Sequence, residues 1–316
     1  MTDTSLSVVD IRAAAERIAG KVVRTPVLER QVEHATLFIK PEGLQPIGAF
    51  EIRGAVNKMA QLPDDCAGVV AHSSGNHAQA VARAAKLLGL PAVVVMPDNA
   101  PPLKRMRTEA DGAEVIIVGP DSDERRDRAR QIAAERGFVA VEPYDDLDIA
   151  AGQGTLALEL LEDAGPIDQL FAPVSGGGVM AGCAVAIRAA CPSAEIIAVE
   201  PDAKPAFHRS MAEGERVAVP PPDTIADGLR VRVPGSLTWP IMRSLVDRTT
   251  LVSDAEMEDA MAWALSELRV VLEPSGATAL AAALRDGRGR VGVVCTGGNA
   301  DPALLARIAA RVASGD

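Results

Sequence analysis

The sequence predicts an α/β fold in which two doubly wound domains share a cleft, and two observations support this. Short apolar segments alternate with helical patterns along most of the 316 residues, which is typical of βαβ units and a parallel sheet. Hydrophobic residues make up 48% of the chain but aromatic residues only 3%. The core is therefore expected to consist of Ala, Val, Leu and Ile, as in a sheet flanked by helices.

The first third of the chain is expected to begin with a helix and then to alternate. Apolar residues recur at helical spacing between the capping residue Ser7 and Gly20. A connecting segment at 25–28 leads to a strand at 37–39 and to a turn bracketed by Gly48 and Gly54. After it the pattern predicts a strand at 69–71, a helix at 77–88, a strand at 92–95, a helix at 103–110, a strand at 114–118 and a charged helix at 123–136.

The same alternation resumes in the second half of the chain. It predicts a helix at 153–163, a strand at 170–174, a helix at 179–190 and a strand at 196–199. A proline-rich region that includes Pro220, Pro221 and Pro222 is expected to be irregular. The last predicted elements are helices at 254–268 and 275–283, a strand at 291–294 and a helix at 302–312.

Charge and cysteine usage exclude several classes of function. The formal net charge is -11, which argues against a nucleic-acid or anionic-membrane surface and favours a small-molecule ligand. No signal-peptide pattern or long apolar run is present, so a soluble, cytoplasmic protein is expected. The four cysteines have no metal-ligand spacing and are expected to be reduced: Cys66, Cys183, Cys191 and Cys295.

A first candidate loop follows the apolar strand at 69–71 and opens a helix. It reads Ser73, Ser74, Gly75, Asn76 and His77. The unpaired backbone N–H groups at a helix N-terminus form a seat for a carboxylate. Ser and Asn are also the favoured capping residues, so a plain helix cap is the alternative interpretation.

A second candidate loop, Ser175 to Gly182, lies between the strand at 170–174 and a helix. Consecutive glycines let successive N–H groups converge on an anion at the positive end of a helix dipole, which predicts a phosphate cradle. The spacing of Gly176, Gly178 and Ala181 also fits a dinucleotide motif, with Glu200 as a ribose partner. A Rossmann-type, NAD-binding oxidoreductase is therefore an alternative.

Five ordered segments, together with the run Gly48–Ala55 around residue 51, resemble one family over roughly residues 20 to 310. The family is that of the fold-type II pyridoxal phosphate (PLP) enzymes, whose fold is tryptophan-synthase-β-like, and within it the threonine and serine dehydratases (ammonia-lyases) and serine racemases. The two loops above belong to the resemblance, as does the run around residue 51. The remaining segments are Thr224–Arg230, Glu273–Ala277 and Cys295–Asn299.

The resemblance implies an organisation and a set of contacts. The small domain would be an insertion at 65–145, the large cofactor domain would comprise 1–64 and 146–316, and the protein would be a homodimer. The residues implied to bind the cofactor are Phe50, Asn76, Gly176, Gly177, Gly178, Val179, Gly228, Glu273 and Thr296. Those implied to bind the substrate are Ser73, Ser74, Gly75, Asn76 and His77, with Ser74 as a catalytic acid/base as in racemases.

The chain departs from the family at Glu51, because the resemblance places the PLP-binding lysine there. A carboxylate cannot form an imine with the cofactor aldehyde, so PLP would bind non-covalently if at all. Glu51 can still act as a general acid or base. Neither Lys40, on the preceding strand, nor Lys58, about two helical turns later, is expected to replace the lysine.

The resemblance also bears on metal binding. Family members with a regulatory metal carry a Glu and a downstream Asp near Glu200. The downstream positions here are Lys204, Pro205 and Ala206, so no metal is expected.

The reaction implied is β-elimination of water from a β-hydroxy-α-amino acid, which yields a 2-oxo acid and ammonia. With Glu51 in place of lysine, three interpretations stay open. The protein is an impaired or altered dehydratase, a lyase or isomerase (racemase) that uses Glu51 as its acid/base, or a non-catalytic homologue that binds a ligand.

Overall fold

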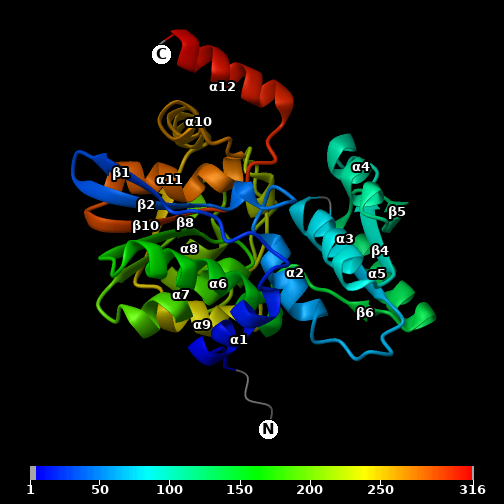
Figure 1. Ribbon diagram of the computed structural model, residues 1–316. Coiled ribbons are helices and arrows are strands. Elements are labelled where there is room, and N and C mark those ends of the chain that lie inside the picture. The colour runs from blue at the N-terminus through cyan, green and yellow to red at the C-terminus, as the bar shows by residue number, and fades with distance from the viewer. Residues whose placement is uncertain (1–4, 74, 315–316) are drawn as a thin grey trace.

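The computed structural model describes residues 5–73 and 75–314, which form two sheets with helices on their faces (Figure 1). All neighbouring strands of the larger sheet are parallel except β1 and β2. That sheet has six strands, in the spatial order β1 (Leu28–Val32), β2 (Ala35–Pro41), β10 (Gly289–Cys295), β7 (Gln169–Pro173), β8 (Glu195–Pro201) and β9 (Arg248–Val252).

Alternate residues of these strands face opposite layers of helices, as the two-residue period of a strand requires. Phe38 and Leu170 pack in the core below the sheet in Figure 1, whereas Leu37 and Phe171 pack in the core above it. The lower layer contains α1 (Val8–Ile18), α6 (Leu147–Ala164), α7 (Gly178–Ala190) and α9 (Thr238–Leu245). The upper layer contains α10 (Asp254–Trp263), α11 (Pro274–Asp286) and, outermost, α12 (Pro302–Ser314).

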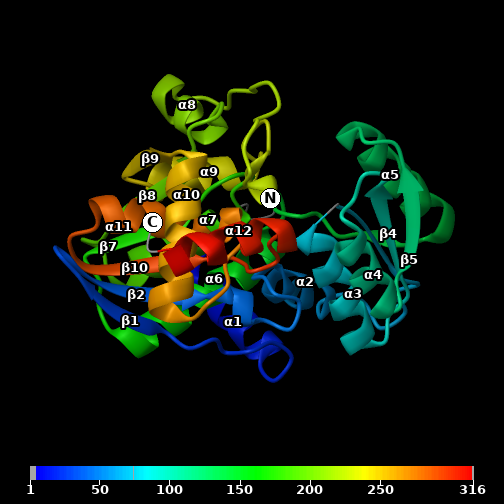
Figure 2. The same ribbon diagram turned by 90° about the horizontal axis from the view of Figure 1, so that it is seen from above.

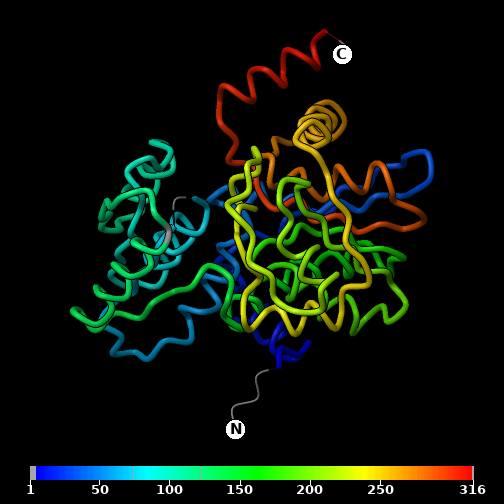
Figure 3. The backbone as a smooth tube through the Cα atoms, turned by 180° about the vertical axis from the view of Figure 1, so that it is seen from behind, coloured from blue at the N-terminus to red at the C-terminus, as the bar shows by residue number. Residues whose placement is uncertain are grey.

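The smaller sheet has four parallel strands and forms a separate lobe, as the views from above and behind show (Figures 2 and 3). Its strands are, in spatial order, β5 (Glu114–Val118), β4 (Ala92–Pro97), β3 (Val69–His72) and β6 (Val139–Ala140). Its helices are α3 (Asn76–Leu88), α4 (Pro102–Ala110) and α5 (Ser122–Arg136), and α2 (Glu51–Met59) lies between the lobes. The domain boundaries proposed from the sequence stay a prediction.

The structure differs from the sequence-based expectations in the second half. The region after β8 is not wholly irregular, because it contains α8 (Ala206–Glu213), the short helix η2 (Asp227–Leu229), α9 and β9. Helix α6 begins at Leu147 and not at residue 153, because the Asp146 side chain caps it by accepting from Asp148 N and Ile149 N. Helix α10 ends at Trp263 and continues as a π-helical turn, η3 (Ala264–Leu268).

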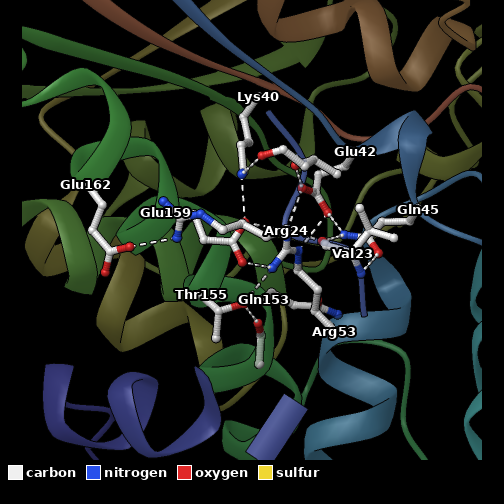
Figure 4. Close-up of polar contacts among 12 residues, drawn as sticks. Val23, Arg24, Lys40, Glu42, Gln45, Arg53, Gln153, Thr155, Glu159 and Glu162 are labelled. Carbon is white, nitrogen blue, oxygen red and sulfur yellow. Dashed lines mark hydrogen bonds and ion pairs between the residues drawn. The ribbon is translucent and has the colours of Figure 1, made fainter. Parts of the chain in front are cut away.

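A buried ion network anchors α2 to the larger lobe (Figure 4). The Arg53 guanidinium donates to both oxygens of Glu42, in the short helix η1 (Glu42–Leu44), and to both oxygens of Glu159 on α6. Lys40 Nζ donates to Glu159 and to the carbonyl oxygen of Thr25. Arg53, Lys40 and Glu42 are fully buried. The network therefore fixes the start of α2 relative to the larger sheet, and Lys40 is structural.

Close backbone packing reinforces the same junction. A side chain at Gly152 on α6 would lie 2.6 Å from Arg53 O, so only glycine lets α6 approach α2 this closely. Lys58, at the other end of α2, pairs with Asp146 and Asp148. Within residues 5–73 and 75–314 no helix is long and apolar enough to cross a membrane.

Candidate active site

Glu51 is the first residue of α2, and two backbone contacts set its position. Phe50 N donates to Thr296 O at 3.0 Å, and Gly298 N donates to Gly48 O at 2.9 Å. The loop before α2 is thereby joined to the loop that follows β10. Because Glu273 N donates to Gly297 O in that second loop, the Glu51 and Glu273 carboxyls lie close enough for their charges to interact.

Asn76 connects the two carboxyls. Its Nδ2 donates to Glu273 Oε1 at 2.7 Å, and its Oδ1 accepts from Asn299 Nδ2 at 3.0 Å. The Asn76 side chain also lowers the pKa of Glu51. Asn76 is the first residue of α3, in the smaller lobe, whereas Glu273 is the N-cap of α11. Asn76 of the predicted substrate loop, the predicted catalytic residue Glu51 and the predicted cofactor-binding residue Glu273 therefore lie in one cluster.

Each of the two carboxyls has one oxygen without a hydrogen-bond donor, and both groups have a raised pKa. Glu273 is only 2% exposed, and Oε2 of Glu51 and Oε2 of Glu273 are buried without a hydrogen-bond partner among the described residues. Burial, together with the charge of Glu273, raises the pKa of Glu51 to about 8. Burial also raises the pKa of Glu273 to about 7, against the attraction of Lys104. Near neutral pH the pair therefore holds at least one proton.

Lys104 is the cation of this cluster, and sequence reasoning did not identify it. It lies on α4, is 7% exposed, and donates from Nζ to Asp227 Oδ2 at 2.9 Å. Burial alone would lower its pKa, but the charges of Asp227, Glu273 and Glu51 outweigh burial and hold the pKa above its usual value. The only sequence signal is a basic residue in the first turn of a helix, which usually lies in solvent.

The glycine loop precedes α7 as predicted. Gly177 has φ +106°, a conformation that favours glycine. The carbonyl oxygen of Gly176 accepts from Thr238 Oγ1 at 2.6 Å and from Gly235 N at 3.0 Å. The Tyr144 ring lies against Gly176, where an added Cβ would come within 2.3 Å of it. Tyr144 and Thr238, which sequence reasoning missed, thus support the loop from behind.

An orphaned hydroxyl marks the start of the glycine loop. Ser175 Oγ is buried and has no hydrogen-bond partner in the described part of the chain. Val179 and Gly178 form the first turn of α7. A hydroxyl and a helix N-terminus at one place provide donors for an oxyanion.

The remaining predicted cofactor residues lie beside Ser275, on α11. Gly228 N donates to Ser275 Oγ at 3.0 Å, and Thr296 Oγ1 donates to Ser275 O at 3.3 Å. The Thr296 hydroxyl would have to turn away from Ser275 to donate to a ring nitrogen. These contacts place the segment containing Gly228 next to the loop after β10, whose Thr296 carbonyl oxygen accepts from Phe50 N.

The described residues of the predicted substrate loop make different kinds of contact. Ser73 Oγ accepts from Gly75 N at 3.1 Å. Ser74 lies outside the described residues. The His77 imidazole is buried and contacts Val141 O through Nε2 at 3.0 Å, so contact with a carboxylate would fall to its backbone N–H.

Glu200 caps a helix. Its two carboxylate oxygens accept from Phe207 N at 3.0 Å and His208 N at 2.6 Å, at the start of α8, and burial raises its pKa to about 7. These bonds already use the group that the dinucleotide interpretation needs as a ribose partner. Within the described ranges, no group of three His, Cys, Asp or Glu side chains is placed to hold a metal ion.

Known proteins resemble this chain over nearly its whole length. A family model described as pyridoxal-phosphate dependent enzyme matches residues 18–297. A serine racemase of Oryza sativa subsp. indica is 43% identical over 310 residues, covering 93% of this chain and 91% of that protein. An L-threo-3-hydroxyaspartate ammonia-lyase of Saccharomyces cerevisiae is 41% identical over 303 residues, covering 92% and 93%. The solved structure of maize serine racemase has a TM-score of 0.91 at 39% identity and covers 98% of both chains, which confirms the predicted fold class.

Proposed function

Because the chain belongs to the pyridoxal-phosphate dependent enzymes, in the serine racemase and threonine or hydroxyaspartate ammonia-lyase group, we propose that it is an ammonia-lyase with Glu51 as its acid/base. The substrate class is a β-hydroxy-α-amino acid, and the products are a 2-oxo acid and ammonia. Water leaves from Cα and Cβ, and hydrolysis of the resulting enamine returns one water and releases ammonia. Glu51 stands at the position that the sequence resemblance assigns to the family lysine.

The residues present fit a PLP molecule held without a covalent bond. The buried, partnerless Ser175 hydroxyl and the glycine turn at Gly177 supply donors for its phosphate. Thr296 and Asn76 supply a hydroxyl and an amide for its ring. Residue 51 offers no amine, and Lys40 and Lys58 are engaged in ion pairs elsewhere. When bound, PLP supplies an electron sink for the bonds at Cα.

The side chains of this chain would perform the proton transfers. Elimination requires removal of the Cα proton and protonation of the departing hydroxyl. A carboxyl group whose pKa is about 8 is present in both protonation states near neutral pH, which is the condition for an effective acid or base. Removing the Cα proton falls to ionised Glu51, and protonated Glu51 or Glu273 can protonate the hydroxyl.

One observation carries this proposal. Glu51 has a buried, partnerless carboxyl oxygen, and its carboxyl shares Asn76 with Glu273. A residue that had lost its function would more often be exposed or neutralised, because an unpaired buried carboxyl destabilises the fold. An ionised Glu51 would repel the phosphate of bound PLP. For a separation of about 7 Å and an effective dielectric near 20, this repulsion is about 2 kcal/mol per unit charge, and a protonated Glu51 avoids it.

Product release by three proteins tests the proposal. The parent, Glu51→Gln and Glu51→Lys are incubated with PLP and with L-serine, L-threonine or L-threo-3-hydroxyaspartate, and 2-oxo acid and ammonia are measured. We expect turnover by the parent and a loss of about 10²-fold or more in Glu51→Gln. If only Glu51→Lys releases product, and alone shows a visible absorption band with PLP, the parent is a disabled dehydratase and the proposal is wrong.

The assembly implied by the resemblance is also a proposal. We expect a homodimer, and light scattering of the purified protein measures its mass in solution. A monomeric mass at concentrations where the protein is active would contradict it.

A further inference from the structure

Among the described residues, the charge cluster around Asn76 contains more carboxyls than cations. Three carboxyls, those of Glu51, Glu273 and Asp227, face one lysine, Lys104. The lysine is hydrogen-bonded to Asp227 and to no other of the three. Asn76 thus acts on both Glu51 and Glu273, and neither carboxyl has a cation bonded to it among the described residues.

The two partnerless oxygens show that a donor is missing. Glu273 is 2% exposed, and its Oε2 and that of Glu51 are buried and unbonded. A buried acceptor without a donor costs free energy. Both oxygens belong to carboxyls around Asn76, which joins the two lobes, so one small group with several N–H donors would satisfy them together.

We infer that the Glu51 and Glu273 carboxyls form a receptor for a primary ammonium group of a ligand bound in the cleft. An ammonium group carries three donors and one positive charge, which matches two carboxyls better than an aldehyde, a pure acceptor, does. The inference deepens the proposed function, on which it rests for the location of the site. Two ligands could bring the group: the aminomethyl form of the cofactor, pyridoxamine 5′-phosphate, or the α-ammonium of an amino acid.

The receptor also gives an acid/base role at the start of catalysis. An amino acid reaches the protein with a protonated amine, which must lose its proton before it can attack a carbonyl carbon. Transfer of that proton from the ammonium nitrogen to a Glu273 carboxylate oxygen leaves a neutral amine and a neutral carboxyl, and it keeps Glu51 ionised for removal of the Cα proton. No further reactant is required for this step.

Binding of matched ligand pairs tests the inference without turnover. Pyridoxamine 5′-phosphate and pyridoxine 5′-phosphate differ only in an ammonium against a hydroxyl group, and so do L-serine and L-glycerate. Calorimetric titrations at about pH 9 compare each pair in the parent protein, Glu51→Gln, Glu273→Gln and the control Glu33→Gln. Glu33 is 86% exposed, so its replacement should change nothing.

We expect the ammonium member of at least one pair to bind about tenfold or more tightly in the parent and the control, as a charge-assisted hydrogen bond would give. The ratio should fall to within about threefold in Glu51→Gln, and Glu273→Gln should reduce it as well. The ligand pair for which the parent protein shows this preference identifies the source of the ammonium group. In the parent, binding near neutral pH should release protons, measured by titration in two buffers, because the cation lowers the proton affinity of the pair.

The inference is overturned if neither pair shows a preference, or if the preference survives in both Glu51→Gln and Glu273→Gln. These outcomes are separate from failure of the proposed lyase activity. A protein that prefers ammonium ligands but releases no 2-oxo acid keeps the receptor and loses the proposed reaction. A protein that turns over serine without any ammonium preference keeps the reaction and loses the receptor.

Discussion

Asn76 Nδ2 lies 2.7 Å from Glu273 Oε1, and this hydrogen bond crosses from the smaller lobe to the larger one. It connects the first residue of α3 to the N-cap of α11. The same amide lowers the pKa of both the Glu51 and the Glu273 carboxyl against the effect of burial. Any relative movement of the lobes would therefore change the proton affinity of the candidate acid/base.

Lys104 is expected to tune the Glu51 and Glu273 pair. Its positive charge lowers the pKa of both carboxyls. Lys104→Gln should therefore raise, by about 0.5–1 pH unit, the pH at which the affinity for the ammonium ligand is half-maximal. Binding measured between about pH 6 and pH 10 gives the midpoint. The exposed Lys86→Gln is the control. An unchanged midpoint would show that Lys104 does not act on the pair electrostatically.

Glu51→Gln should stabilise the protein, and most strongly in alkaline solution. The pKa of Glu51 is raised to about 8 in the folded state, from an ordinary value of 4.5. Its contribution to stability is therefore present below about pH 4.5 and lost as the pH rises through about 8. The free energy of unfolding should increase by on the order of 3 kcal/mol at about pH 9 and by less than about 1 kcal/mol near pH 5. Urea unfolding at both pH values measures it, and an equal effect at both would contradict the raised pKa.

Arg53 should be essential to the fold and independent of the chemistry. Arg53→Met would leave the buried carboxylates of Glu42 and Glu159 without their main partner, which should cost about 3–5 kcal/mol. Arg53→Lys should not restore stability, because one ammonium group cannot reproduce the paired bonds to two carboxylates. Adding Glu42→Gln to Arg53→Met should recover part of the loss in chemical unfolding. No recovery would mean that the charge of Glu42 is not what destabilises the single variant.

His77 should make the smaller lobe sensitive to acid. Burial lowers its pKa to about 4 from 6.5, partly offset by its hydrogen bond to Val141 O. Its contribution to stability is present above about pH 6.5 and lost as the pH falls towards 4, because the unfolded chain binds the proton more readily. His77→Gln should flatten the pH dependence of the melting temperature between about pH 6 and 4. His34→Gln, at an exposed site, should leave that dependence unchanged.

The segment from residue 69 to residue 136 follows the sequence-based expectations more closely than the rest of the chain. The strands and helices from Val69 to Arg136 follow the alternation of apolar segments closely, because each strand is short, apolar and bounded by a turn. The short strands Leu28–Val32 and Val139–Ala140 were missed, because their side chains are at most partly buried and carry no clear period. Helix Thr238–Leu245 was not predicted, because it lies in the proline-rich region that was expected to be irregular.

By itself, the sequence determined the fold class, the glycine loop and the presence of a carboxyl at residue 51, since these depend on local periodicity and on residue chemistry. Only the tertiary structure decided that Glu51 shares Asn76 with Glu273 and that Lys104 reaches the same cleft. Residues 51, 76 and 104 lie on three separate helices and residue 273 is the N-cap of a fourth, so their contacts follow from how the two lobes pack. Burial in that cleft sets their proton affinities, and no local pattern in the chain encodes it.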